Sequence, residues 1–82
     1  MRLPRDISGE ELAQALRVLG YEVTRDVSGH LRLTTEQGGQ HHVSVPKHKE
    51  LRTGTLSGVI GDVARHFGMS KNEVCERVFG SR

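Results

Sequence analysis

The spacing of apolar residues along this chain changes from a helical period to a period of two and then back again. Apolar residues recur at helical spacing in the first segment, at Leu12, Ala15, Leu16 and Leu19. They then alternate with polar residues in three short runs, at 21–24, 30–34 and 42–45. Helical spacing returns over 56–67. Because the two periods suit different elements, this pattern predicts a helix, three strands and a further helix.

Short polar signals mark both ends of the first helical segment. Ser8 is a favourable N-cap, and Glu11 three residues later completes a capping box. Ile7 is placed to pack on Leu12 across the cap, and Gly20 supplies the left-handed residue that commonly ends a helix. We therefore expect a helix that begins at Ser8 and ends before Gly20.

Short turns separate the three alternating runs. Residues 26–29 and 36–39 contain the glycine and small polar residues that favour turns. Pro46 ends the third run, because proline cannot donate a hydrogen bond to a strand ladder. Turns of this length join antiparallel neighbours, so the three runs predict an antiparallel meander.

Two helices are expected after the third strand. Thr53 or Thr55 can cap the first, which Gly68 ends. Ser70 and Glu73 form another capping box, which starts a short third helix with its apolar residues at Val74, Val78 and Phe79. The predicted fold class is α+β, with the order α-β-β-β-α and helices on one face of a three-stranded antiparallel sheet, plus a short C-terminal third helix.

Strand alternation also predicts which residues are left on the other face of the sheet. Successive strand residues point to opposite faces, so the leucines and valines of the second and third strands are expected to face the helices. The opposite face would then be open to solvent and would carry His30, Arg32, Thr34, His42 and Ser44. His41 alternates with the buried valines, so we expect it to be a half-buried packing residue rather than a ligand.

Length and composition limit the classes of protein considered. The 82 residues correspond to one domain, 1–82, with an aliphatic core and little room for a large cofactor. The single cysteine, Cys75, excludes an internal disulfide and a cysteine zinc site, and fits a reducing compartment. No run approaches the ~18 apolar residues of a membrane span, and the first residues do not resemble a signal peptide. We expect a cytoplasmic protein without a membrane role.

Positive charge gathers in two places. The formal net charge is +2 and the pI is about 9.1. Arg25 and Arg32 flank the first strand turn, and one acid, Glu50, lies within a loop that contains Lys47, His48, Lys49 and Arg52. This loop leads into a helix start at Thr53 and Thr55, whose free N–H groups favour anions. The segment predicts a phosphate-binding surface, with a solvated run of charges as the alternative.

An α-β-β-β-α order with helices on one sheet face is the layout of the double-stranded RNA-binding domain. Within this layout a set of residues resembles one family more closely: 7–20, Tyr21-Glu22-Val23, Gly29-His30, Val43-Ser44-Val45-Pro46 and Leu51-Arg52-Thr53-Gly54-Thr55-Leu56. These residues resemble the HicA toxins, small mRNA interferases of bacterial toxin–antitoxin pairs. The resemblance covers roughly 7–67, and 68–82 forms a C-terminal helical extension beyond it.

The family motif is Gly-Ser-His or Gly-Gly-His at the start of the second strand, and this chain has Ser28-Gly29-His30. The resemblance implies that His30 is required for RNA cleavage, that no cofactor or metal takes part, and that a HicB-like antitoxin covers the active face. Ser28 departs from the motif, and serine adopts a positive φ less readily than glycine.

Cleavage of RNA by its own 2′-hydroxyl needs a proton acceptor, a proton donor and positive charge near the phosphate. Histidine suits either proton role, and Arg32 can form charge-assisted hydrogen bonds to phosphate. His42 or His48 is a candidate for the second group. A zinc site built from His30, His42 and His48 has no adjacent acid or cysteine to support it.

Two other classes remain open. Residues 62–78 resemble part of a helix-turn-helix, with Ala64, Gly68 and Val74 at suitable spacings but Arg77 where an apolar residue is expected. A DNA-binding protein would use Lys71 and Asn72 there. The third class is a non-catalytic module that binds RNA or docks an acidic protein partner, and in that class His30 is an ordinary polar residue on a solvated strand.

Overall fold

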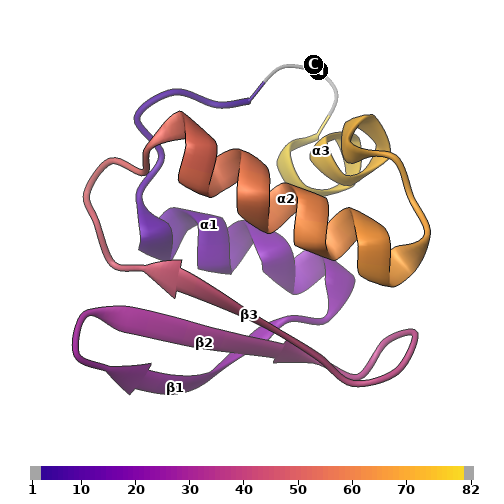
Figure 1. Cartoon of the computed structure of the whole chain (residues 1–82), viewed down its shortest axis with the longest axis horizontal. Coiled ribbons are helices and arrows are strands. Elements are labelled where there is room, and N and C mark those ends of the chain that lie inside the picture. Colours follow the sequence, from indigo (N-terminus) through magenta and orange to yellow (C-terminus); the bar gives the residue numbers. More distant parts are fainter. Residues whose placement is uncertain (1–2, 81–82) are drawn as a thin grey trace.

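The computed structural model describes residues 3–80, which form the predicted series of elements (Figure 1). They are α1 (Gly9–Ala15) with a 3-10 turn, η1 (Leu16–Leu19), then β1 (Glu22–Val27), β2 (His30–Thr35), β3 (His41–Pro46), α2 (Thr53–Phe67) and α3 (Lys71–Phe79). The strands are antiparallel in the order β1-β2-β3. The predicted α+β class with the double-stranded RNA-binding layout is therefore confirmed. Within residues 3–80 no helix has the length and apolar character needed to cross a membrane.

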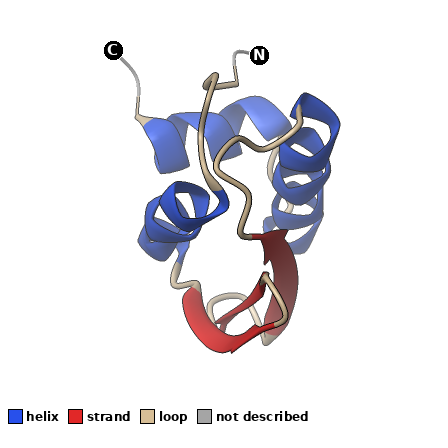
Figure 2. Ribbon diagram, turned by 90° about the vertical axis from the view of Figure 1, so that its left-hand side faces the viewer, coloured by secondary structure: helices blue, strands red, loops and turns tan. Residues whose placement is uncertain are grey.

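The helices lie together on one face of the sheet (Figures 1 and 2). Helix α1 packs on β2 and β3, α2 packs on β3, and α3 packs against α2 and η1. The inward side chains of β2 and β3 are almost completely buried beneath these helices, as alternation predicts: Leu31, Leu33, Val43 and Val45. This burial supplies the main stabilisation of a small domain, at ~25 cal/mol per Å² of apolar surface.

The ends of the helices agree with the sequence except at α2. Ser8 Oγ accepts from the Glu11 N–H at 3.0 Å, and Glu11 Oε1 accepts from the Ser8 N–H at 2.9 Å. The same reciprocal pair joins Ser70 and Glu73. The expected threonine cap of α2 is wrong. Arg52 occupies the N-cap with φ −66° and ψ 144°, and its side chain makes no capping bond, because both threonines already lie inside the first turn.

The alternation of Tyr21 and Val23 with Glu22 and Thr24 predicts a half-buried first strand, and this prediction is wrong. Val23 and Val27 are 50% and 51% exposed, whereas Tyr21 is fully buried but precedes β1. Val23 is exposed because β1 is an edge strand, and α1 reaches across β2 and β3 rather than over it. Val27 pairs with His30, on the face opposite the helices, so no helix covers it. The strand also continues to Val27, so the first turn is shorter than the predicted 26–29.

His41 joins the start of β3 to the end of α2. Its Nδ1 lies 2.7 Å from Tyr21 Oη, and its ring stacks on His66 with centroids 4.4 Å apart and an interplanar angle of 8°. His66 Nε2 in turn donates to the Gln37 carbonyl at 2.9 Å. The prediction of a half-buried packing residue is confirmed. Burial, followed by the nearby His66, lowers the pKa of His41 below 6.5, and burial raises the pKa of Tyr21 to about 12.

The lowered pKa of His41 predicts acid-sensitive folding. Unfolded histidine titrates near 6.5, whereas folded His41 stays neutral to lower pH. The unfolded chain therefore binds more protons below that value. Its contribution to stability should be complete above pH 6.5 and should fall as the pH drops towards the folded pKa. One such group can supply a slope of at most ~1.4 kcal/mol per pH unit.

Urea unfolding followed by circular dichroism between about pH 7.5 and about pH 5.5 measures this slope. The His41→Asn variant should show a shallower dependence than the unmodified chain, although its stability at the upper pH will also be lower. His48→Asn, at an exposed residue of the loop after β3, serves as the control. An unchanged slope in His41→Asn would assign the acid sensitivity to another group.

Candidate functional site

A two-residue turn presents His30 at one end of the sheet. Ser28 has φ 54° and Gly29 has φ 77°, so both central residues are left-handed, as in the type I′ turns that join tight hairpins. His30 follows as the first residue of β2, paired with Val27 on one side and Pro46 on the other. The Lys47 N–H extends the ladder by donating to the Gly29 carbonyl at 2.8 Å. The turn is therefore held on both sides.

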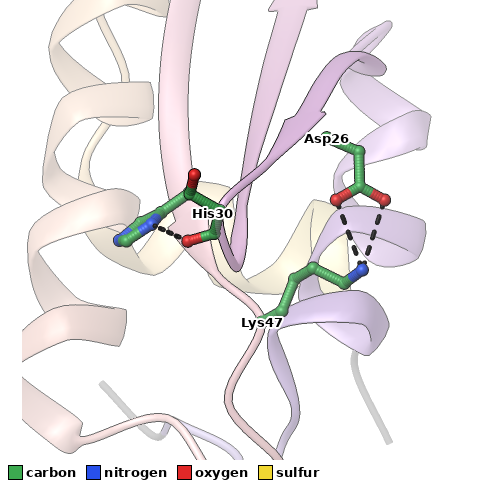
Figure 3. Close-up of polar contacts among 4 residues, drawn as sticks. Asp26, His30 and Lys47 are labelled. Atoms are coloured by element: carbon green, nitrogen blue, oxygen red, sulfur yellow. Dashed lines mark hydrogen bonds and ion pairs between the residues drawn. The ribbon is translucent and has the colours of Figure 1, made fainter.

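The imidazole of His30 is exposed and held by its own turn (Figure 3). Its Nδ1 lies 3.2 Å from the Ser28 carbonyl oxygen. A carbonyl oxygen can only accept, so Nδ1 carries the proton in this bond. In the neutral ring Nε2 is then unprotonated and free to accept a proton. This geometry gives His30 the form that a general base requires.

A β-bulge places Arg25 beside Arg32 on the open face. Val23 pairs with Leu33 and Arg25 pairs with Arg32, so Thr24 is an extra residue in β1. A bulge of this kind turns two successive side chains towards one face. Arg25 therefore shares the open face with Arg32, and the alternation of the sequence gives no signal for this shift. Within residues 3–80 neither guanidinium takes part in an ion pair.

A chain of hydrogen bonds crosses all three strands on the same face. Thr24 Oγ1 lies 2.8 Å from Thr34 Oγ1, and Thr34 Oγ1 lies 2.8 Å from His42 Nδ1. Thr24 was not anticipated as a site residue, although its alternation with Val23, the partner of Leu33, already places it on this face. His42 pairs with Thr34, four residues beyond His30, or ~13 Å along β2. The structure therefore does not bring His42 to His30.

The basic loop lies beyond the end of β3. The Lys47 ammonium is 3.2 Å from the Asp26 carboxylate, and this pair points away from the side on which the His30 ring lies (Figure 3). His48, Lys49 and Arg52 are exposed. Thr53 and Thr55 lie in the first turn of α2, which contains no acid and has no side-chain cap. The loop is anchored to α1, because the Gly9 N–H donates to the His48 carbonyl at 3.0 Å.

The remaining candidate groups belong to the helices. Lys71 Nζ is 2.7 Å from Ser57 Oγ, so the lysine assigned to DNA in the helix-turn-helix hypothesis contacts α2 instead. Cys75 is buried, and burial raises the pKa of its thiol. Across residues 3–80 no three histidine, cysteine or acidic residues are grouped so as to hold a metal ion.

Comparison with known families identifies the same region of the chain. A family model described as "HicA toxin of bacterial toxin-antitoxin" matches residues 9–68, from the start of α1 to the residue after α2. The match includes the turn, His30, the open face of the sheet and the basic loop, and it leaves α3 outside. No curated protein and no solved structure matches the chain.

Ser28 offers a test of the turn that carries His30. A residue with a side chain destabilises the fold by ~1–2 kcal/mol when it is held at positive φ. Asparagine adopts this conformation more readily than serine. Ser28→Asn creates the Asn-Gly pair favoured in type I′ turns and should raise the free energy of unfolding by ~0.5–1 kcal/mol.

Denaturant unfolding of the Ser28→Asn variant measures this gain. Ser44→Asn places the same residue in the extended backbone of β3 and should give no gain. Equal stability of the Ser28→Asn variant and the unmodified chain would contradict the left-handed turn.

Proposed function

Because the chain belongs to the HicA toxin family of bacterial toxin–antitoxin systems, we propose that it is an endoribonuclease that cleaves mRNA with His30 as the proton acceptor. The observation that carries this proposal is the hydrogen bond from His30 Nδ1 to the Ser28 carbonyl. That bond leaves Nε2 unprotonated on an exposed surface of the matched region. Such an atom can act on a polymer without the enclosed pocket that a small substrate would need.

The proposed reaction is an internal transesterification. Nε2 of His30 takes the proton of a ribose 2′-hydroxyl, whose oxygen attacks the adjacent phosphorus. The bond from phosphorus to the 5′-oxygen breaks, and that oxygen takes a proton from solvent. The products are a 2′,3′-cyclic phosphate and a 5′-hydroxyl. Arg32 lies two residues along β2 on the same face, and its positive charge attracts the RNA backbone towards His30.

The basic loop supplies the second part of the proposed RNA site. Lys49 and Arg52 are exposed beside the uncapped start of α2, where no acid opposes an incoming phosphate. The N–H groups of the first turn and its positive dipole end add to this attraction. His48, Thr53 and Thr55 are proposed to contact the RNA backbone in the same region. Lys47 can join them only by leaving Asp26.

An antitoxin of the HicB type is the proposed protein partner. Family membership implies a cognate antitoxin. The open face offers it an exposed histidine and two arginines that form no ion pair within residues 3–80, so we propose that it covers this face with an acidic surface. RNA and antitoxin would then exclude each other.

Cleavage of a labelled single-stranded RNA by the purified chain tests the proposal. The His30→Ala variant should cleave at a rate lower by ~10²–10⁴-fold, because general-base catalysis is lost. Treatment of the products with acid should open cyclic phosphate ends that the unmodified chain has formed. Expression of the unmodified chain in bacteria should arrest growth, and expression of His30→Ala should not.

Arg77→Gln, which changes an exposed residue of α3, is the control and should cleave at the unmodified rate. Circular dichroism must show that His30→Ala is folded. A folded His30→Ala protein that cleaves as fast as the control would exclude His30 as the proton acceptor.

A further inference from the structure

Arg25 and Arg32 form an unfavourable pair of like charges that a bound anion would stabilise. They are direct cross-strand partners, and like charges placed opposite each other destabilise a sheet. The two ion pairs within residues 3–80 involve other residues, Lys47 with Asp26 and Arg65 with Asp62. Glu36, which lines the same depression, accepts a hydrogen bond from Gln40 at 3.1 Å, and Glu22 pairs with Thr34 on this face without forming an ion pair within residues 3–80. A destabilising contact of this kind between like charges is typical of a functional site, where binding compensates for its cost.

These arginines line a shallow depression on the open face, together with Thr24, Thr34, Glu36, Gln40 and His42. Its volume is about 420 Å³, within the ~300–1,000 Å³ typical of small-ligand sites, and it is large enough for one nucleotide. It begins two residues from His30 on β2, or ~7 Å along the strand. That step is comparable with the distance between neighbouring phosphates of an extended nucleic acid strand.

The direction of each hydrogen bond in the threonine chain can be deduced by counting protons. Thr24 Oγ1 donates its one proton to the Arg32 carbonyl at 3.3 Å. Thr34 must therefore donate to Thr24, which leaves Thr34 Oγ1 as the acceptor for His42 Nδ1. His42 then presents an unprotonated Nε2, which can accept a hydrogen bond. A ribose 2′-hydroxyl is a donor suited to this atom, and DNA lacks it.

We propose that the open face binds single-stranded RNA along β2, with the phosphate next to the cleaved one held by Arg25 and Arg32 and a ribose beyond it recognised by His42. This inference rests on the proposed function, because it places the cleaved phosphate at His30. A three-stranded sheet spans only ~10 Å between its outer strands, which suits one nucleic acid strand better than a duplex. Stacking of bases would involve arginine and histidine planes, so base preference should be weak.

Binding is measured by fluorescence anisotropy with the full chain carrying His30→Ala, so that RNA is not consumed. The probes are a labelled ten-nucleotide oligouridine, the corresponding oligodeoxyuridine and an RNA duplex of the same length. The single-stranded RNA should bind more tightly than the duplex. Arg25→Gln and Arg32→Gln, each added to His30→Ala, should weaken it ~3–10-fold and reduce the log–log salt slope by ~0.7. His42→Ala should reduce RNA binding while leaving DNA binding nearly unchanged.

Arg77→Gln in the same background removes an equal charge from α3 and serves as the matched control. The arginine variants should be at least as thermally stable as the control, because each removes a like-charge contact. Losses in RNA binding no larger than for Arg77→Gln, or tighter binding of the duplex, would overturn the proposed path. Equal losses for RNA and DNA in His42→Ala would overturn the ribose contact.

The two proposals fail in different ways. The binding measurement needs no cleavage, so an unmodified chain that does not cleave RNA can still show the arginine and His42 effects. In the converse case, cleavage depends on His30 while RNA affinity is unchanged in the Arg25→Gln and Arg32→Gln variants. That result would support the proposed reaction and contradict the path along β2.

Discussion

Burial of one face of the β2–β3 pair determines where every other side chain of these strands lies. Leu31, Leu33 and Val45 are at most 5% exposed beneath the helices, and a strand has only two faces. A shift of one residue in register would bring arginine and histidine into the core, where an unpaired charge is prohibitive. The hydrophobic term therefore places His30 and Arg32 on the open face without any direct interaction of their own.

Two local departures from regular strand geometry then complete the site. The left-handed turn at Ser28 and Gly29 brings the chain back within two residues, so that the Ser28 carbonyl can hold the His30 ring. The bulge at Thr24 turns Arg25 onto the same face and Asp26 onto the other, where it pairs with Lys47. A bulge also disrupts an exposed edge, which discourages pairing with another sheet. The same irregularity thus protects β1 and concentrates positive charge.

The sequence predicts those parts of the fold that depend on local chemistry. Capping residues Ser8 and Ser70 and the alternation in β2 and β3 are each decided by neighbours a few residues away, and the structure agrees with them. The exposure of Val23 depends instead on how far α1 reaches across the sheet. The pairing of Arg25 with Arg32 depends on an extra residue that leaves no mark in the apolar pattern. Tertiary arrangement decides both, so periodicity alone predicts neither the exposure of Val23 nor the face on which Arg25 lies.

The polar character of the open face determines how an antitoxin could inhibit RNA binding there. Val27 and Pro46 flank His30, but the centre of the open face carries hydroxyl, imidazole and guanidinium groups with little apolar surface. A protein that covers it gains less from the hydrophobic effect than from matching charge, and such complexes associate quickly and weaken in salt. RNA would meet the same cations with the same chemistry. On the proposed function, an antitoxin therefore needs only to neutralise Arg25 and Arg32 to compete with RNA, even where it leaves the His30 ring uncovered.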